Sequence, residues 1–193
     1  HLKTMLRFAP DRLSPPSATE KPQVFAAQGP HRKRVALLTG CVQQVLAPAI
    51  NDATVRLLTR HGCEVVVAEG AGCCGALEHH LGRDALDRVK ANVDAWTRVF
   101  ERGRLDAVVA NASGCGTMVK DYGFLLRGDP AYADKAKRIS ALTRDVTELM
   151  AELGLKEPMI SIGQRIAYQS PCSMQHGQKV SNQPKALLAK AGF

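Results

Sequence analysis

From residue 34 onward, short apolar runs alternate with longer segments of helical periodicity. The short runs are rich in β-branched residues and are typical of strands: RVALLT (34–39), EVVVA (64–68), DAVVA (106–110) and RIAYQ (165–169). Strands that alternate with helices indicate a parallel sheet with right-handed crossovers. We therefore predict an α/β fold, a parallel sheet with helices on both faces.

Two of the intervening segments are predicted to be helices. Residues 48–62 have apolar residues at helical spacing, a proline near the start and Gly62 at the end, where a glycine commonly follows a helix. Residues 85–103 repeat this design, with an apolar stripe formed by Val89, Val93, Trp96 and Phe100. Such stripes usually face a protein core, so we predict that Trp96 is a core residue.

Residues 10–30 differ in composition, because they hold five of the ten prolines and lack a sustained apolar period. We interpret residues 1–33 as a linker or tail. The formal net charge is +8, but seven basic and only two acidic residues lie within residues 1–34. The basic excess is therefore mostly a tail, and with one tryptophan and no interleaved aromatic residues the sequence does not favour nucleic-acid binding.

The sequence has no membrane span and no secretory signal, because it lacks both a long apolar run and an apolar core with a cleavage site. We expect a cytoplasmic protein. Six cysteines in a reducing compartment are more often ligands or reactive thiols than disulfides. The chain begins with His rather than Met, so we also expect it to be a segment of a longer polypeptide.

An internal repeat relates residues 37–62 to residues 167–192. Both contain, in order, a predicted strand, a loop cysteine, a predicted helix, two leucines, a basic residue and a glycine. We therefore predict that residues 34–163 form a first domain. Residues 164–193 would then begin a second, truncated repeat.

Five of the six cysteines follow the predicted strands: Cys41, Cys73, Cys74, Cys115 and Cys172. Parallel strands end at one edge of a sheet, where open α/β folds bind their ligands, so all five should converge there. Cys63 instead follows a helix and begins a strand. We predict that it is a buried structural thiol at the opposite edge.

The loops that carry these cysteines are rich in glycine, and the candidates for contact with a cofactor are Gly40, Gly72, Gly75 and Gly114. Glycine permits positive φ and lets backbone N–H groups approach an anionic ligand, which suits a thiolate-bound cluster. Ser113 is a candidate N-cap for a helix near Cys115, where the helix dipole would lower the thiol pKa. The alternative is that these are small loop residues and incidental cysteines.

The identity of the metal depends on the spacing of the thiols. Zinc sites usually contain a short CxxC or HxxxH pair, which this chain lacks; Met118 stands where Cys115 would have its partner. Loop histidines such as His79, His80 and His176 are more often solvated than ligating. Widely spaced thiolates fit an iron–sulfur cluster better than zinc, and adjacent cysteines can bind neighbouring irons. A zinc-stabilised or thiol-based redox module without iron is the alternative.

Four stretches carry a resemblance to a known family: TGCVQQVLAPAIN (39–51), EGAGCCGALEHHLGR (69–83), NASGCGTMVKDYGFLL (111–126) and YQSPCSMQHGQKVSNQPKALLAKAGF (168–193). They closely resemble the iron–sulfur subunits of bacterial glycolate oxidase (glycolate dehydrogenase). These subunits belong to a wider group with the cysteine-rich CCG domain, which includes heterodisulfide reductase subunits and lactate-utilisation proteins. The resemblance covers nearly all of residues 24–193.

The resemblance implies a Rossmann-like CCG domain with an iron–sulfur cluster of the 4Fe-4S type. In the family pattern, a single cysteine is followed by Cys-Cys-Gly and then by Cys-x-x-Cys. By this resemblance, Cys41 would be the first ligand, Cys73 and Cys74 the adjacent pair, and Cys115 the first cysteine of the Cys-x-x-Cys. Met118 replaces the final cysteine of the fullest pattern, so the pattern of a five-cysteine, non-cubane cluster is incomplete here, whereas a four-thiolate cluster stays compatible with the resemblance. With Cys172, these cysteines are the candidate metal ligands.

Other parts of the family pattern are missing from this chain. Cys172 would open a second CCG repeat, whose remaining ligands are absent, and the two ferredoxin-like motifs expected upstream are absent as well. The resemblance therefore implies a central segment of the subunit.

The resemblance also implies electron transfer. In the family, a partner subunit carrying FAD oxidises glycolate to glyoxylate, and the iron–sulfur subunit passes electrons to quinone or another acceptor. No GxGxxG follows any predicted strand, so a dinucleotide site has no support. We expect the chain to be an electron-transfer subunit of an oxidoreductase. The subunit itself would be non-catalytic, and on its own it would not oxidise glycolate. It could attach peripherally to the inner face of the cytoplasmic membrane.

Overall fold

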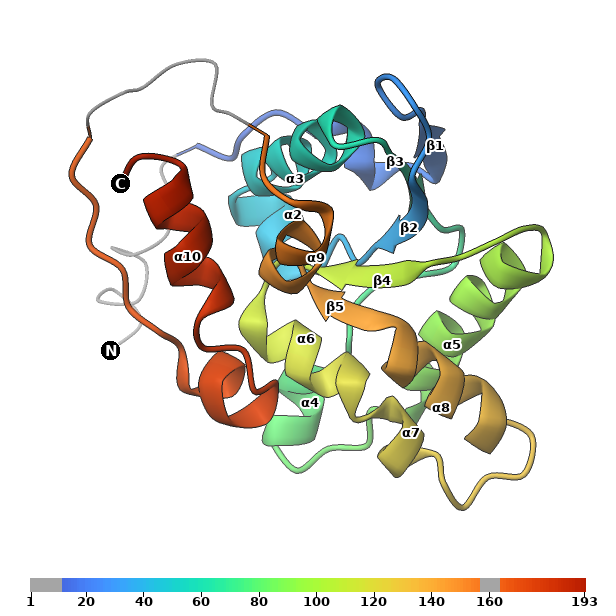
Figure 1. Ribbon diagram of the computed structural model, residues 1–193. Helices are drawn as coiled ribbons and strands as arrows, with labels where there is room; N and C mark the ends of the chain where they lie inside the picture. The colour runs from blue at the N-terminus through green and yellow to red at the C-terminus, as the bar shows by residue number, and fades with distance from the viewer. Residues whose placement is uncertain (1–11, 157–163) are drawn as a thin grey trace.

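The computed structural model describes residues 12–156 and 164–193 (Figure 1). Its central element is a five-stranded sheet with the order β1–β3–β2–β4–β5. The strands are β1 (Gln23–Phe25), β2 (Lys33–Leu37), β3 (Cys63–Val67), β4 (Ala107–Ala110) and β5 (Thr143–Asp145). Strands β2 to β5 run parallel, and β1 pairs antiparallel with β3 at one edge. The predicted α/β fold with a mainly parallel sheet is confirmed.

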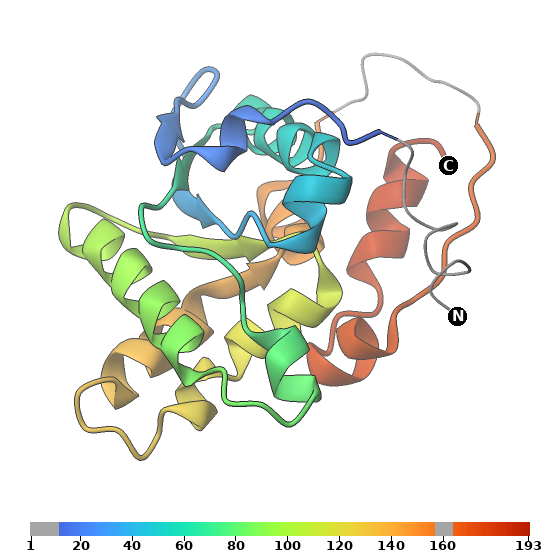
Figure 2. The same cartoon turned by 180° about the vertical axis from the view of Figure 1, so that it is seen from behind.

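Helices cover both faces of this sheet (Figures 1 and 2). They are α3 (Ala49–Arg60), α5 (Leu86–Glu101), α6 (Ser113–Lys120), α8 (Ala133–Leu142) and α9 (Val146–Leu153). Successive side chains of a strand point to opposite faces. Thus Ala36 packs with residues of α5, α6 and α8, whereas Val35 and Leu37 pack with residues of α3 and α9.

Shorter elements connect and cover these layers. They are η1 (Ala18–Glu20), α2 (Val42–Leu46), α4 (Ala76–His80), α7 (Tyr122–Leu125), the π-helical turn η2 (Ser173–Gly177) and α10 (Gln183–Lys190). Of these, α2 and α4 follow the carboxyl ends of β2 and β3, and η2 packs against α6. Helices α2 and α4 therefore lie at the edge at which the parallel strands end.

The two predicted helices form where the sequence places them, as α3 and α5. The residue after the cap of α3 is Gly62, with φ of +83°, and a Cβ atom there would lie 2.6 Å from the carbonyl oxygen of Pro30. Trp96 is fully buried, which confirms it as a core residue. Phe100 lies at the margin of the stripe, partly exposed, with its ring against the guanidinium of Arg138.

The linker interpretation is wrong for Gln23–Phe25, which form β1. This segment directly follows Pro22 and is only three residues long, so its local sequence carries almost no strand signal. It forms a strand because β3 offers a free edge, to which an antiparallel partner can add its backbone hydrogen bonds.

The predicted strand at 165–169 is also wrong. These residues have no regular structure and are exposed. Strand propensity takes effect only where a partner strand and a buried face are available. Here the segment runs toward η2 and α10, and α10 packs against α9 (Figure 1). The repeat is therefore reproduced in its short turn and helix, and not in its strand.

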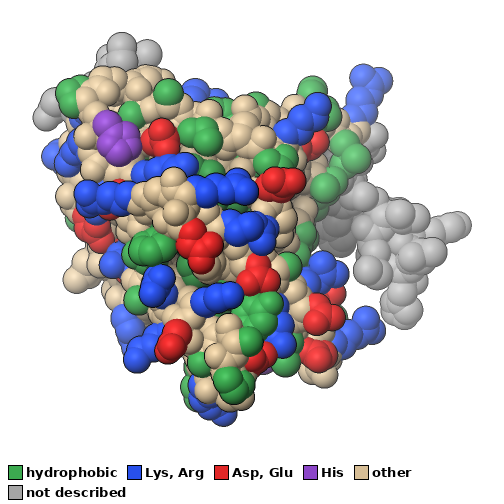
Figure 3. Space-filling model, turned by 90° about the vertical axis from the view of Figure 1, so that its right-hand side faces the viewer, with side chains coloured by type: hydrophobic (Ala, Val, Ile, Leu, Met, Phe, Trp, Pro, Cys, Tyr) green, Lys and Arg blue, Asp and Glu red, His purple; other side chains and the backbone are tan. Residues whose placement is uncertain are grey.

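The surface over α5 and α8 carries both charge signs, interspersed (Figure 3). Lys90 pairs with Asp129 at 2.8 Å, and Lys135 approaches Asp94 at 3.9 Å. Within the two described ranges, no helix is both long and apolar enough to cross a membrane.

Candidate metal centre

Four cysteines line one cavity of about 530 Å³ at the carboxyl edge of the sheet: Cys41, Cys73, Cys74 and Cys115. Cys41 immediately precedes α2, which follows β2. Cys73 and Cys74 lie in the loop between β3 and α4, and Cys115 lies in the first turn of α6, after β4. The convergence predicted from strand positions is therefore found for these four thiols.

The four thiols lie close enough to influence one another's ionisation. The neighbouring thiol of Cys115 raises the pKa of Cys74, and the thiol of Cys74 lowers the pKa of Cys115. Burial and the neighbouring thiol of Cys73 raise the pKa of Cys41. Four thiolates this close repel one another, so full ionisation of the group requires a countercharge such as a metal.

Backbone amides point at the double cysteine. The amide nitrogen of Gly75 lies 3.4 Å from the sulfur of Cys73, and that of Ala76 lies 3.5 Å from the sulfur of Cys74. Gly75 has φ of +84°, and a Cβ atom there would lie 3.1 Å from the Cβ of Ala85. A glycine is therefore required for the turn that brings these amides to the sulfurs.

The other candidate glycines have different surroundings. Gly40, with φ of +71°, and Gly114 both line the cavity. Gly72 and Gly75 do not line it; Gly72 instead donates its amide to the side-chain oxygen of Asn92 at 2.8 Å. Contact of these glycines with a cofactor stays a prediction.

Cys63 and Cys172 lie elsewhere. Cys63 is fully buried at the start of β3, at the opposite edge, as predicted, and burial raises its pKa. Cys172 is exposed at the start of η2 and does not line the cavity, contrary to the expected convergence, because no strand leads to it. Of the nearby histidines, His80 lines the cavity and His176 lies in η2.

Ser113 is not the N-cap of α6. That position belongs to Ala112, and Ser113 is the first residue of the helix. Its hydroxyl instead lies 2.9 Å from the hydroxyl of Ser173, and its carbonyl accepts from the side-chain amide of Gln178 at 2.9 Å. Ser113 therefore joins the segment that carries Cys172 to the helix that carries Cys115.

A network of side-chain amides, which sequence reasoning missed, links the Cys41 and Cys115 loops around the buried Asn51. The Gln43 amide donates to the side-chain oxygens of Asn51 at 2.6 Å and Asn111 at 2.8 Å. Asn51 in turn donates to the carbonyl of Thr39 at 2.8 Å. One signal was available, because Asn51 shares the apolar face of its helix with Val55 and Leu58.

A second buried polar group lies beneath the double cysteine. Asn92 donates to the carbonyl of Cys73 at 2.8 Å, and Tyr122 donates to the carbonyl of Cys74 at 2.9 Å. Asn92 interrupts the apolar stripe of α5 between Val89 and Trp96, which is the sequence signal that could have identified it.

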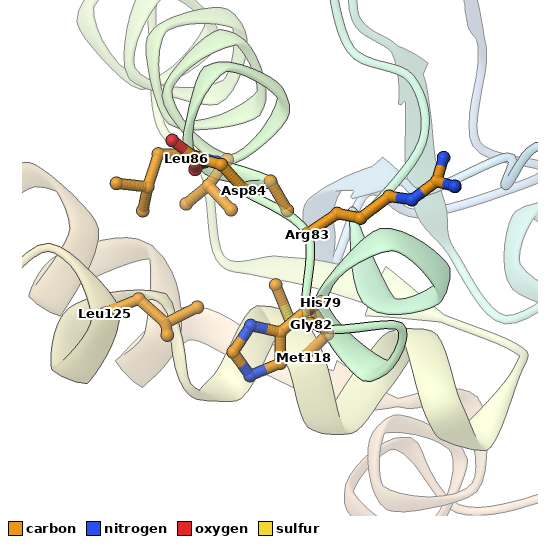
Figure 4. Close-up of a pocket in the computed structure, with 9 residues that line it drawn as sticks. His79, Gly82, Arg83, Asp84, Leu86, Met118 and Leu125 are labelled. Carbon is orange, nitrogen blue, oxygen red and sulfur yellow. Dashed lines mark hydrogen bonds between the residues drawn. The ribbon is translucent and has the colours of Figure 1, made fainter.

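Met118, which stands where a further family cysteine would, does not line the cysteine cavity. It is buried in the same apolar cluster as Cys74. It lines a second cavity of about 410 Å³ together with His79, Leu86 and Leu125 (Figure 4). The thioether therefore serves as a packing group next to the double cysteine.

Among residues 12–156 and 164–193, no three His, Cys, Asp or Glu side chains are placed to hold a single metal ion. The four thiols are arranged around a cavity instead. This soft donor set, with backbone amides directed at two of its sulfurs, fits a thiolate-bound iron–sulfur cluster.

The chain matches the CCG cysteine-rich domain family over residues 35–120. It is 42% identical over 165 residues to the glycolate oxidase iron-sulfur subunit of Escherichia coli (strain K12), covering 84% of this chain and 40% of that protein. It is 31% identical over 192 residues to the probable glycolate oxidase iron-sulfur subunit of Bacillus subtilis (strain 168), covering 97% of this chain and 42% of that protein.

Lactate utilization protein A of Geobacillus thermodenitrificans (strain NG80-2) is 31% identical over 144 residues, which cover 73% of this chain and 58% of that protein. The chain therefore spans about two fifths of the two glycolate oxidase relatives and less than two thirds of the third relative. No solved structure matched the chain.

Proposed function

We propose that this chain holds an iron–sulfur cluster through Cys41, Cys73, Cys74 and Cys115, and that it transfers electrons as a subunit of an oxidoreductase of the glycolate oxidase type. The main support is the convergence of these four thiols, from three separate loops, on one cavity within a CCG domain. Four thiolates match the ligand number of a 4Fe-4S cluster.

The chain's own residues would provide the ligands and their surroundings. When bound, an iron–sulfur cluster supplies a one-electron carrier. The four thiolates bind it, and the amides of Gly75 and Ala76 stabilise negative charge on two of the sulfurs. Among the described residues, no Asp, Glu, Lys or Arg side chain lines the cavity, and much of its lining is apolar: the buried Leu38 and the exposed Val42, Leu46, Ile50 and Leu77.

The proposed substrate chemistry belongs to a partner. A subunit carrying FAD would oxidise glycolate to glyoxylate, and this chain would pass the electrons to quinone or another acceptor, in the cytoplasm or at the inner face of the cytoplasmic membrane. The names of the two glycolate oxidase relatives support this assignment. A reconstitution experiment tests it: glycolate-dependent dye reduction should require both the flavin subunit and this chain. Glycolate turnover by this chain alone would contradict the division of roles.

The gathering of thiols in one cavity also favours a second candidate, a thiol-based redox module. Cys41, Cys73, Cys74 and Cys115 line the same cavity, so a pair of them could cycle between dithiol and disulfide without iron. Metal content separates the two candidates.

The decisive experiment is anaerobic reconstitution of the 193-residue chain with iron and sulfide, followed by analysis of iron, zinc and acid-labile sulfide. We expect a brown protein with stoichiometric sulfide, and loss of both iron and colour in Cys115→Ser. A colourless protein that binds zinc, or one that forms disulfides in place of a cluster, would contradict the proposal.

A further inference from the structure

The carbonyl groups of the double cysteine are held by two side chains that are not ligands. Asn92 of α5 is 1% exposed; its side-chain oxygen accepts from the amide of Gly72 at 2.8 Å, and its nitrogen donates to the carbonyl of Cys73 at 2.8 Å. The same nitrogen donates to the hydroxyl of Tyr122 at 3.0 Å, and that hydroxyl donates to the carbonyl of Cys74 at 2.9 Å. Each donor in this chain of hydrogen bonds therefore has a defined acceptor.

The hydroxyl of Tyr122 also controls an amide that points at a thiol. A peptide group is planar, so fixing its carbonyl on one side fixes the direction of its N–H on the other. The peptide between Cys74 and Gly75 accepts from Tyr122 through its carbonyl, and it presents its N–H to the sulfur of Cys73 at 3.4 Å. One rigid group therefore links the tyrosine to the proposed ligand.

Tyr122 and Asn92 are themselves held in place by packing. The Tyr122 ring is fully buried and stacks on Trp96, with ring centroids 6.4 Å apart and planes inclined by 22°. Asn92 and Trp96 are four residues apart on α5, so both project from the same side of the helix. The two hydrogen-bonding groups have little freedom to adjust if the loop moves.

We propose that Asn92 and Tyr122 are positioning residues that hold the Cys73–Cys74 pair in its ligating geometry and direct the Gly75 amide at the Cys73 sulfur. The inference extends the proposed function, because it assigns a role toward the same cluster. Partners that orient metal ligands commonly contribute about 10- to 100-fold to metal affinity.

The test compares Tyr122→Phe with Tyr132→Phe as a matched control. Tyr122→Phe keeps the buried ring and removes only the hydroxyl. Tyr132→Phe likewise removes a single hydroxyl. That hydroxyl donates to the Asp94 carboxylate at 2.8 Å, and neither residue lines the cysteine cavity. In competition with an iron chelator, we expect Tyr122→Phe to retain iron about 10- to 100-fold less well than the parent chain, and Tyr132→Phe to match the parent.

The reduction potential provides a readout that lost packing alone would not change. An amide that donates to a cluster sulfur stabilises the more negative, reduced state. If the Gly75 amide loses its alignment, the midpoint potential of Tyr122→Phe should become more negative, and its electron paramagnetic resonance spectrum should change. Asn92→Asp should have a larger effect, because it removes the donors to Cys73 and Tyr122. If it does not fold, Tyr122→Phe decides alone.

Thiol reactivity of the iron-free chain keeps this inference distinguishable from the proposed function. We expect the alkylation rates of Cys73 and Cys74 to change in Tyr122→Phe and not in Tyr132→Phe, whether or not the chain binds iron. A Tyr122→Phe chain with altered thermal stability but parental alkylation rates, iron retention and potential would overturn the positioning role. Failure of the parent chain to bind iron would instead overturn the proposed function.

Discussion

Cys63 and Cys74 are equally hidden from solvent, at 0% and 2% exposure, yet their surroundings differ. Cys63 is packed in an apolar cluster with Leu58 and Leu149. Cys74 lines the same cavity as Cys115, its sulfur accepts a hydrogen bond from an amide, and its carbonyl accepts one from Tyr122. Burial alone therefore does not distinguish a structural cysteine from a candidate ligand, whereas polar groups arranged around the sulfur and its backbone do.

The two edges of the sheet differ in the same way. At the amino edge, charged groups pair near the surface: Arg34 bonds to Glu64 at 2.5 Å, and its amide donates to Asp106 at 2.8 Å. At the carboxyl edge, neutral amides join the loops. Neutral groups can fix the thiol loops without adding net charge beside an anionic cluster, which is a physical reason for using Asn and Gln there.

The largest expected effect separates the two buried cysteines. Cys74→Ser should abolish iron retention, because the site loses a thiolate and its charge balance, while Cys63→Ala should keep the iron. Iron and sulfide analysis of both variants, reconstituted side by side, measures this difference. Equal iron in the two would remove Cys74 from the ligand set.

A smaller effect is expected from the polar networks at the two edges. Asn51→Ala should lower the free energy of unfolding by about 2 kcal/mol, because it leaves the buried Thr39 carbonyl without its donor and removes one acceptor shared by the half-buried amides of Gln43 and Asn111. Glu64→Gln, at the partly exposed pair with Arg34, should cost about 1 kcal/mol or less. Urea unfolding measures both, and similar costs would refute the contrast between the edges.

Cys63→Ala should itself have a modest cost. The substitution removes a small buried side chain that has no polar partner to lose, so we expect a loss of about 1 kcal/mol in the free energy of unfolding. Thermal and urea unfolding of the iron-free chain measure this loss without interference from the cluster. A cost as large as that of Asn51→Ala would show that Cys63 does more than pack.

The smallest effect is expected for Cys172→Ser. The thiol is exposed at the start of η2 and does not line the cavity, so its loss should leave iron retention and stability at the parental level. The same reconstitution assay applies. Substantial loss of iron would mean that the segment carrying Cys172 moves to the cavity when a cluster binds.

Much of the candidate site was predictable because direction along a parallel strand determines the edge at which the next loop lies. That rule brought Cys41, Cys73, Cys74 and Cys115 together and placed Cys63 at the other edge. Apolar spacing likewise identified α3, α5 and the buried Trp96. In each case the relevant information lies within a short stretch of chain, since apolar periodicity and the position of a residue relative to its own strand are local properties.

Other features required distant partners. The segment at 165–169 has strand propensity but pairs with no strand, whereas Gln23–Phe25 became β1 because β3 offers a free edge. Without its strand, Cys172 does not reach the cavity. The amides of Asn51 and Asn92 reveal their role only when the backbone groups they bind come close. The sequence by itself determined which residues approach the carboxyl edge; the tertiary structure decided which of them meet, because a hydrogen bond requires two groups within about 3 Å, and folding alone brings together residues far apart in the chain.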